Sequence, residues 1–224
     1  MEWNVFTKEG RKSLSFDVRR LIVVGFSGYD VEKTLDHIRE LEAEGIRCPK
    51  ELPVVYECSP ALLTQAEEIA VVAGASSGEV EYLLMEHAAK TYIGLGSDHT
   101  DRALEAVSIH KSKQSCAKPM ARDLWDYSEI AEHFASIRLL SSQTVNGETV
   151  DYQAGVTGDL LSLETILAKV RSEIQDLEDC VIYTGTVPLK QGFKFGERFS
   201  CALIDDRIGR RIDLGYDIRV IEEH

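Results

Sequence analysis

Short apolar runs bounded by turn residues recur along the chain, and they predict a protein rich in β-strands. The runs at 20–26 (RLIVVGF) and 53–57 (PVVYE) combine β-branched and aromatic residues, which is typical of strands. Six further runs of this kind follow: 68–73, 79–86 and 91–95, which we expect to form a β-meander, and 180–183, 199–204 and 216–221. The strands do not alternate with helices as βαβ units would, so the pattern predicts a β-rich α+β fold.

Three stretches carry apolar residues at helical intervals. In the stretch 31–46, one stripe is formed by four residues: Val31, Leu35, Ile38 and Leu41. His37 and Glu40 lie beside this stripe rather than within it, so we expect the helix to pack only partly on the core. The other two helices are expected over 101–110 and 158–174. No linker divides the sequence, and we expect one domain over residues 1–224.

Composition, charge and cysteine usage narrow the class of protein. At 224 residues, 44% of them hydrophobic and 28% charged, the chain suits a soluble globular protein. A formal charge of −13 disfavours nucleic acid as a partner. The apolar runs are too short for a membrane span, and the first residues lack the pattern of a secretory signal, so we expect a cytoplasmic protein without a membrane partner. Five cysteines without a C-x-x-C pair indicate neither a disulfide framework nor a thiolate zinc site.

Glu79 and Glu81 form the pair with the clearest chemical meaning. Residues two apart on a strand point to the same face, so the two carboxylates share one surface. At about 5 Å and an effective dielectric of about 20 they repel each other by ~3 kcal/mol, so a buried pair needs a cation, a proton or a basic partner. Asp98 follows the next expected strand and returns to the pair if 79–95 forms a hairpin. Three hard oxygen ligands favour Mg²⁺, Mn²⁺ or Ca²⁺ over zinc, whereas a solvent-exposed strand edge fits the same spacing without a metal.

The order of these and other residues resembles the fumarylacetoacetase superfamily. That superfamily carries a Glu-x-Glu pair, an aspartate followed four residues later by arginine, a lysine, and a Gly-Thr turn near the end of its barrel. This chain has the same series in the same order: Glu79-Val80-Glu81, Asp98 with Arg102, Lys113, and Gly185-Thr186. Asp36-His37-Ile38-Arg39-Glu40 resembles the superfamily's His-x-x-Glu lid helix. The likeness is greatest to a compact bacterial branch of unassigned reaction, and it implies a mixed β-barrel or β-roll with peripheral helices.

The resemblance implies a metal site and a catalytic dyad. Glu79, Glu81 and Asp98 would hold one divalent cation, with Mg²⁺ expected first and Mn²⁺ or Ca²⁺ as alternatives. His37 and Glu40 would form the dyad, in which the glutamate orients the imidazole and the imidazole takes a proton from water. An ordinary surface pair is the alternative for these two residues.

The catalytic lysine is harder to place, because three lysines lie in the segment HKSKQSCAKP. We expect Lys113 to face the metal, with Lys118 second. Lys118 precedes proline and is therefore biased to an extended segment, which we expect to leave the site. Lys111 is the third candidate. His99, beside the expected metal ligand Asp98, would either orient that ligand or make a local hydrogen bond.

Four further residues are expected to bind the substrate. Arg102 would clamp a substrate carboxylate or neutralise the acidic cluster. Gly185 and Thr186 offer backbone N–H groups and a hydroxyl at a strand end. Glu105 occupies a position where many relatives carry a glutamine that contacts the substrate, and a carboxylate there would repel an acidic substrate.

The reaction expected from the resemblance is hydrolysis of a carbon–carbon bond in a β-dicarbonyl or acylpyruvate-type 2-keto acid. Decarboxylation, hydration and isomerisation of 2-keto acids use the same kind of site, so the fold cannot choose among them. A protein that binds a small dicarboxylate without turnover is the rival from another class, and Glu105 favours it. The expected partner is a small acidic molecule, and a homodimer is expected.

Overall fold

The protein is built around two β-sheets. The computed structural model describes residues 1–30, 32, 39 and 51–224. One sheet has eight strands in the order β2 (Gly10–Ser15), β1 (Glu2–Thr7), β12 (Asp123–Asp126), β9 (Lys90–Ser97), β8 (Val80–His87), β15 (Cys180–Tyr183), β3 (Arg20–Gly25) and β4 (Val54–Cys58). The other has five, in the order β14 (Glu148–Val156), β13 (Arg138–Val145), β16 (Arg198–Asp205), β17 (Arg210–Ile221) and β6 (Glu68–Val72).

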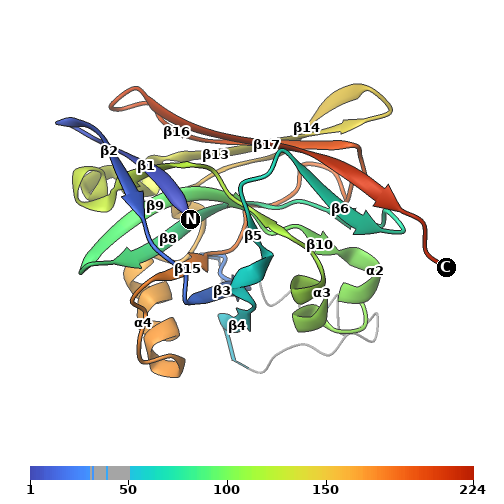
Figure 1. Cartoon of the computed structure of the whole chain (residues 1–224), viewed down its shortest axis with the longest axis horizontal. Helices are drawn as coiled ribbons and strands as arrows, with labels where there is room; N and C mark the ends of the chain where they lie inside the picture. Colours follow the sequence, from blue (N-terminus) through green and yellow to red (C-terminus); the bar gives the residue numbers. More distant parts are fainter. Residues whose placement is uncertain (31, 33–38, 40–50) are drawn as a thin grey trace.

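Short elements surround the two sheets. Two strand pairs are separate from them: β7 (Ser76–Ser77) with β10 (Thr100–Asp101), and β5 (Leu63–Thr64) with β11 (Lys118–Pro119). The described α-helices are α2 (Arg102–Glu105), α3 (Ile109–Ser115) and α4 (Leu163–Glu173). Four 3-10 turns complete the described elements: η1 (Pro60–Leu62), η2 (Tyr127–Glu129), η3 (Ala131–Ser136) and η4 (Thr157–Asp159). In Figure 1 the five-stranded sheet lies across the top, with α4 and the α2–α3 pair below on opposite sides.

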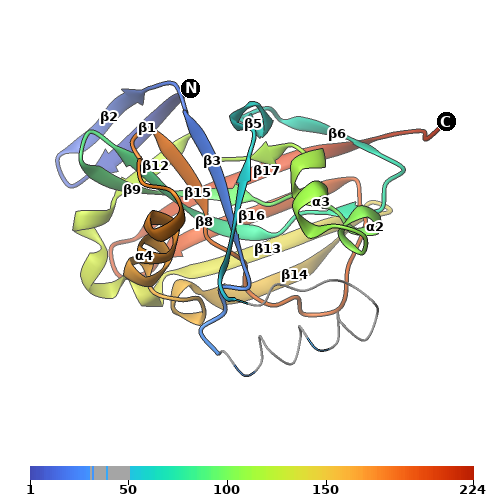
Figure 2. The same ribbon diagram turned by 90° about the horizontal axis from the view of Figure 1, so that it is seen from below.

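Each face of the eight-stranded sheet has its own core. Alternate residues such as Tyr82 and Leu84 pack against side chains of the five-stranded sheet, including Leu203 and Tyr216. The other alternate residues form a second cluster whose buried strand members come almost wholly from the eight-stranded sheet: Trp3, Val5, Leu21, Val23, Tyr56, Cys58, Leu83, Met85, Tyr92, Leu124, Val181 and Tyr183. Buried side chains therefore line both faces of the eight-stranded sheet, and Figure 2 shows α4 on one side of β3 and the α2–α3 pair on the other.

The hairpin of β8 and β9 is the element that positions the acidic residues. Ala88 and Ala89 at its tip have φ angles of 50° and 57°, the left-handed pair that a tight two-residue hairpin turn requires. The register pairs Val80 with Ser97. Asp98 follows directly and donates its backbone N–H to the Glu79 carbonyl at 3.0 Å. The hairpin expected from the sequence is thus confirmed, and it returns Asp98 to the glutamate pair.

Several sequence expectations hold in this architecture, and two need correction. The β-rich α+β fold with peripheral helices is confirmed, and the strand 180–183 is found with the same bounds. The meander is wrong in one member, because β6 pairs in parallel with β17 in the other sheet. The single helix expected over 101–110 is two helices, since Asp101 caps α2 and Ser108 caps α3. The helix over 31–46 lies outside the described residues.

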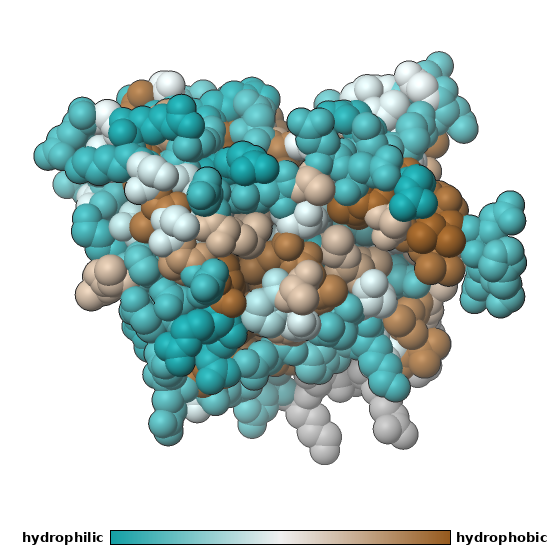
Figure 3. All heavy atoms as spheres, in the orientation of Figure 1, coloured by the Kyte–Doolittle hydropathy of each residue, from teal (hydrophilic) through white to brown (hydrophobic). Residues whose placement is uncertain are grey.

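The outer surface mixes polar residues with a few apolar ones. Apolar residues gather near the C-terminal end of the face drawn in Figure 3. At the ends of β6 and β17, Val72, Val220 and Ile221 are exposed. No helix among the described residues is long and apolar enough to cross a membrane. The described cysteines, Cys58, Cys116, Cys180 and Cys201, are free thiols, in line with the absence of a disulfide pattern in the sequence.

Candidate metal centre

Three carboxylates come together where β8 begins and β9 ends. Glu79 immediately precedes β8, Glu81 is its second residue, and Asp98 follows β9. One oxygen from each carboxylate lies within 4.8 Å of the other two. Glu81 and Asp98 are buried, while the Glu79 side chain keeps 16% of its exposure. The alternative of a solvent-exposed strand edge is therefore wrong for Glu79 and Glu81, because little of either side chain reaches solvent.

Glu81 is held by a backbone donor on a neighbouring strand end. Gly185, two residues beyond β15, donates its N–H to Glu81 Oε2 at 2.8 Å. Gly185 has a φ of 99°, and a side chain there would collide with Ser27 Oγ. Burial raises the pKa of Glu81 well above its usual value, and the nearby Asp98 charge raises it further. A charged Glu81 in this position needs a cation beside it.

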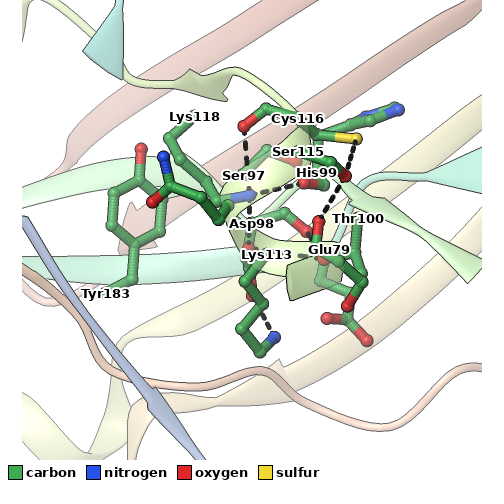
Figure 4. A network of polar contacts seen from close by, with 12 residues as sticks. Glu79, Ser97, Asp98, His99, Thr100, Lys113, Ser115, Cys116, Lys118 and Tyr183 are labelled. Atoms are coloured by element: carbon green, nitrogen blue, oxygen red, sulfur yellow. Dashed lines mark hydrogen bonds and ion pairs between the residues drawn. The ribbon is translucent and has the colours of Figure 1, made fainter. Parts of the chain in front are cut away.

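Asp98 is paired with two lysines, as Figure 4 shows. Lys113 Nζ lies 2.5 Å from Asp98 Oδ2, and Lys118 Nζ lies 3.1 Å from Asp98 Oδ1. Burial alone would raise the pKa of Asp98, but the two ammonium groups outweigh it and hold that pKa below its usual value. Asp98 is therefore a permanent anion at neutral pH.

The two lysines have different surroundings. Lys118 also donates to the carbonyls of His99 and Cys116, at 2.7 and 3.3 Å, so its ammonium group is shared among three fixed acceptors. Lys113, in the last turn of α3, is 7% exposed. Burial lowers the pKa of Lys113, but the charges of Asp98 and the other site carboxylates outweigh that effect and raise it. Lys111, on the same helix, is exposed.

One expectation about these lysines is wrong. Lys118 was expected to leave the site because the residue before a proline is extended. It is extended, in β11, but that strand pairs in parallel with β5 and runs along the site, so the long side chain reaches Asp98. The Lys113 amine is nevertheless the nearer of the two to Asp98.

Glu79 is fixed by Arg102. The arginine begins α2, and its Nη2 lies 3.2 Å from Glu79 Oε1. Its Nη1 donates to Glu105 Oε2 at 2.8 Å, and its Nε donates to Ser77 Oγ at 2.8 Å. Of the two roles considered for Arg102, this geometry favours neutralisation of the acidic cluster over a clamp on a substrate carboxylate. Glu105 is likewise engaged, as the second anion on the same guanidinium.

Thr186 and the backbone around it support the hairpin. The Thr186 hydroxyl donates to the Val80 carbonyl at 2.7 Å and accepts from Gln153 Nε2 at 2.7 Å. Gln153 Oε1 in turn accepts the Val80 backbone N–H at 3.0 Å. The polar groups of the Gly-Thr turn, which the sequence offered to a substrate, thus hold β8 in place at Val80 and Glu81.

His99 sits in a buried network that the sequence left open. Its Nδ1 lies 2.9 Å from the Tyr216 hydroxyl, and its Nε2 lies 2.9 Å from Ser76 Oγ. Burial, together with the nearby Lys118 charge, lowers the pKa of His99 to about 3, so the ring is neutral. These bonds hold the residue that follows Asp98 in place. Tyr216 and Gln153 were missed because each is remote in sequence from the motifs and carries no pattern of its own.

The donor set fits a hard divalent cation. From the described residues, Glu79 Oε2 and Glu81 Oε1 accept no hydrogen bond, since Arg102 and Gly185 take the other oxygen of each carboxylate. Carboxylate oxygens without histidine or thiolate neighbours are the ligands that Mg²⁺, Mn²⁺ and Ca²⁺ prefer. The acidic cluster can therefore bind such an ion. His37 and Glu40, the expected dyad, lie outside the described residues.

A family model matches most of the chain. The model of a family described as a protein of unknown function (DUF2848) matches residues 24–216. A search of curated proteins finds no match.

Solved structures share the fold. A 2-keto-3-deoxy-D-arabinonate dehydratase in its apo form aligns with a TM-score of 0.66 at 15% identity, over 97% of this chain and 79% of the other. A 5-carboxymethyl-2-hydroxymuconate delta-isomerase from Mycobacterium smegmatis gives 0.62 at 14%, over 100% and 99%. A 4-oxalocrotonate decarboxylase from Pseudomonas putida G7, complexed with calcium and acetate, gives 0.54 at 14%, over 89% and 76%. These neighbours belong to the fumarylacetoacetase superfamily, so the fold that the sequence resemblance implied is confirmed.

Proposed function

Because the chain belongs to the DUF2848 family of proteins of unknown function and has the fold of keto-acid enzymes, we propose that it is a metal-dependent enzyme acting on a 2-keto acid. The observation that carries the proposal is the buried cluster of Glu79, Glu81 and Asp98 with Lys113 against it. The dehydratase with the same fold has been solved with magnesium and 2,5-dioxopentanoate, which is a keto acid with one carboxylate.

Each residue of the site would have its own role in the reaction. A divalent cation held by Glu79, Glu81 and Asp98 would supply a Lewis acid for the keto oxygen of the substrate. Lys113 would stabilise the negative charge that develops on the substrate as it enolises, because its ammonium group lies at the edge of the cluster. Arg102 and Gly185 would hold Glu79 and Glu81 in place throughout. The surrounding core excludes bulk water, which strengthens each of these interactions.

We propose hydrolysis of a carbon–carbon bond in a β-dicarbonyl or acylpyruvate-type acid as the specific reaction. That reaction needs a group that removes a proton from water, and His37 with Glu40 is the pair that the sequence offers for it. The proposal for this step rests on the sequence, since both residues lie outside the described part of the chain.

Dehydration, isomerisation or decarboxylation of a 2-keto acid is the second candidate. It is favoured by the neighbours, which are a dehydratase, an isomerase and a decarboxylase. These reactions need proton transfer and enolate stabilisation but no attack by water, and the Lys113 ammonium group can stabilise the enolate. A non-catalytic binding protein, which Glu105 favoured in the sequence, is the remaining alternative, and in the structure that carboxylate bonds Arg102.

A screen of 2-keto acids and β-diketones in the presence of Mg²⁺ or Mn²⁺, with products identified by mass spectrometry, tests the proposal. Two smaller acids from one acylpyruvate establish hydrolysis, and loss of water or carbon dioxide establishes a lyase. Tight metal-dependent binding without any product would favour the binding protein. We further propose that residues 1–224 act as one catalytic domain in a cytoplasmic homodimer. Light scattering on the purified protein measures the oligomeric state.

A further inference from the structure

Arg102, beside the metal centre, already has a partner at each of its three nitrogens. The guanidinium group bonds Ser77, Glu105 and Glu79 through its three nitrogens, at 2.8, 2.8 and 3.2 Å. The Phe193 ring covers one of its faces, with 4.4 Å between the guanidinium carbon and the ring centroid. Only 6% of the Arg102 side chain is exposed. A substrate carboxylate would have to displace these partners to reach it.

The charge balance of the described site residues also disfavours a second carboxylate on the substrate. Four carboxylates face three cations: Glu79, Glu81, Asp98 and Glu105 against Arg102, Lys113 and Lys118. Their single net negative charge becomes a single positive charge when a divalent cation binds. One substrate carboxylate neutralises that charge. A second carboxylate near Glu105, whose side chain is 24% exposed, would meet repulsion without a free cation among the described residues.

Phe193 supplies an apolar surface at the same place. The residue belongs to the segment 184–197 between β15 and β16, the segment that also carries the Glu81 partner Gly185. Although its ring lies on Arg102, Phe193 remains 49% exposed. Covering such a ring with an apolar group is favourable, because the contact removes apolar area from water.

We infer that the substrate carries one carboxylate, in its keto-acid head, and an uncharged apolar tail that packs on Phe193. Glu105 then acts as a specificity residue: it occupies the one cation on that side and repels a charged tail. This inference rests on the proposed function and names the substrate class for the same site.

A matched pair of ligands tests the inference by calorimetry in the presence of Mg²⁺. The compounds 2-oxohexanoate and 2-oxohexanedioate have the same head and chain length, and only the second ends in a carboxylate. We expect 2-oxohexanoate to bind at least roughly 10-fold more tightly, since a like charge near Glu105 opposes the second compound. Pyruvate, which has the head without the tail, should bind more weakly than 2-oxohexanoate.

Three variants assign the effect to residues. Glu105→Gln removes the repelling charge and releases an Arg102 donor, so the preference between the two six-carbon acids should shrink severalfold. Phe193→Ala should abolish the advantage of 2-oxohexanoate over pyruvate while leaving Mg²⁺ affinity unchanged. Phe195→Ala is the matched control, because Phe195 is 46% exposed but makes no ring contact with a cation among the described residues.

The outcomes separate this inference from the proposed function. Equal or tighter binding of 2-oxohexanedioate, with metal dependence intact, would overturn the inference and leave the keto-acid function standing. An unchanged tail advantage in Phe193→Ala would also overturn it. If Mg²⁺ binds but none of the three acids binds with it, the proposed function fails and the inference fails with it.

Discussion

Gly185 and Glu81, 104 residues apart in the sequence, are joined by one hydrogen bond of 2.8 Å from a backbone N–H to a carboxylate. The bond exists because residue 185 has a φ of 99° and has no side chain to strike Ser27 Oγ. Gly185→Ala should therefore shift the turn, weaken metal binding and destabilise the fold by more than the ~1–3 kcal/mol of backbone strain alone. Urea unfolding and metal titration measure the two effects.

Gly209→Ala is the control for this prediction. Gly209 also has a left-handed φ, 66°, but an added Cβ there would have no neighbour within 4 Å. It should lose only about 1 kcal/mol of stability and keep its metal affinity. Equal losses in both variants would mean that Gly185 has no special role at the metal centre.

One divalent cation should bind per chain, and Glu81→Gln should weaken that binding. The change removes a charged ligand, so the dissociation constant for Mn²⁺ should rise by more than about tenfold. Loss of a residue that only hydrogen-bonds a metal ligand already weakens metal binding by about that factor. Isothermal titration calorimetry gives both the stoichiometry and the constant. Glu148→Gln, on an exposed strand end, serves as the charge-matched control and should bind like the parent. Parental affinity in Glu81→Gln would refute the ligand assignment.

Metal should also stabilise the fold through the same site. At a free Mn²⁺ concentration about 100 times the dissociation constant, binding adds ~2.7 kcal/mol to the free energy of unfolding. Addition of a chelator to the parent should therefore lower the denaturation midpoint in urea. Glu81→Gln should show little response to either metal or chelator, and a parent protein indifferent to Mn²⁺ would contradict the site.

The sequence indicated the acidic cluster correctly because its geometry is local. Glu79 and Glu81 share a face by the two-residue period of a strand, and one hairpin is enough to return Asp98 to them. The resemblance added the order of the remaining motifs. The partner of β6 could not be predicted in this way, because its alternating pattern fits the edge of either sheet and only the packing of both sheets selects β17.

The residues that support the site could not be predicted from the sequence, for a related reason. Tyr216 and Gln153 make contacts across more than 70 residues of sequence, to His99 and Val80 respectively. Lys118 was visible as a candidate, but its preference for extended backbone said nothing about which way the strand runs. Local rules fix backbone shape, and tertiary packing decides what a long side chain reaches.

Lys113 and Lys118 should differ in what their loss costs. Lys118→Met leaves Asp98 paired with Lys113 but removes the donor to two buried carbonyls, so it should destabilise the fold by roughly 1–3 kcal/mol for each carbonyl left unsatisfied. Lys113→Met leaves Asp98 paired with Lys118, so the fold and Mn²⁺ affinity should survive while turnover falls. Urea unfolding and activity on the substrate found in the screen measure both. Lys111→Met, on the exposed face of α3, should change neither, and the reverse pattern would exchange the two roles.

The proposed hydrolytic reaction would depend on His37. If His37 and Glu40 form a general base, His37→Ala should lower kcat by roughly 10²- to 10⁴-fold, the usual contribution of such a group. Metal affinity should stay at the parental value, because the ligands Glu79, Glu81 and Asp98 come from a different part of the chain. Glu40→Gln should give a smaller loss of kcat, since it keeps the imidazole and removes only the charge that orients it. Near-parental turnover in His37→Ala would exclude the hydrolytic dyad and leave a lyase or isomerase reaction, with Lys113 stabilising the enolate, as the reaction of this site.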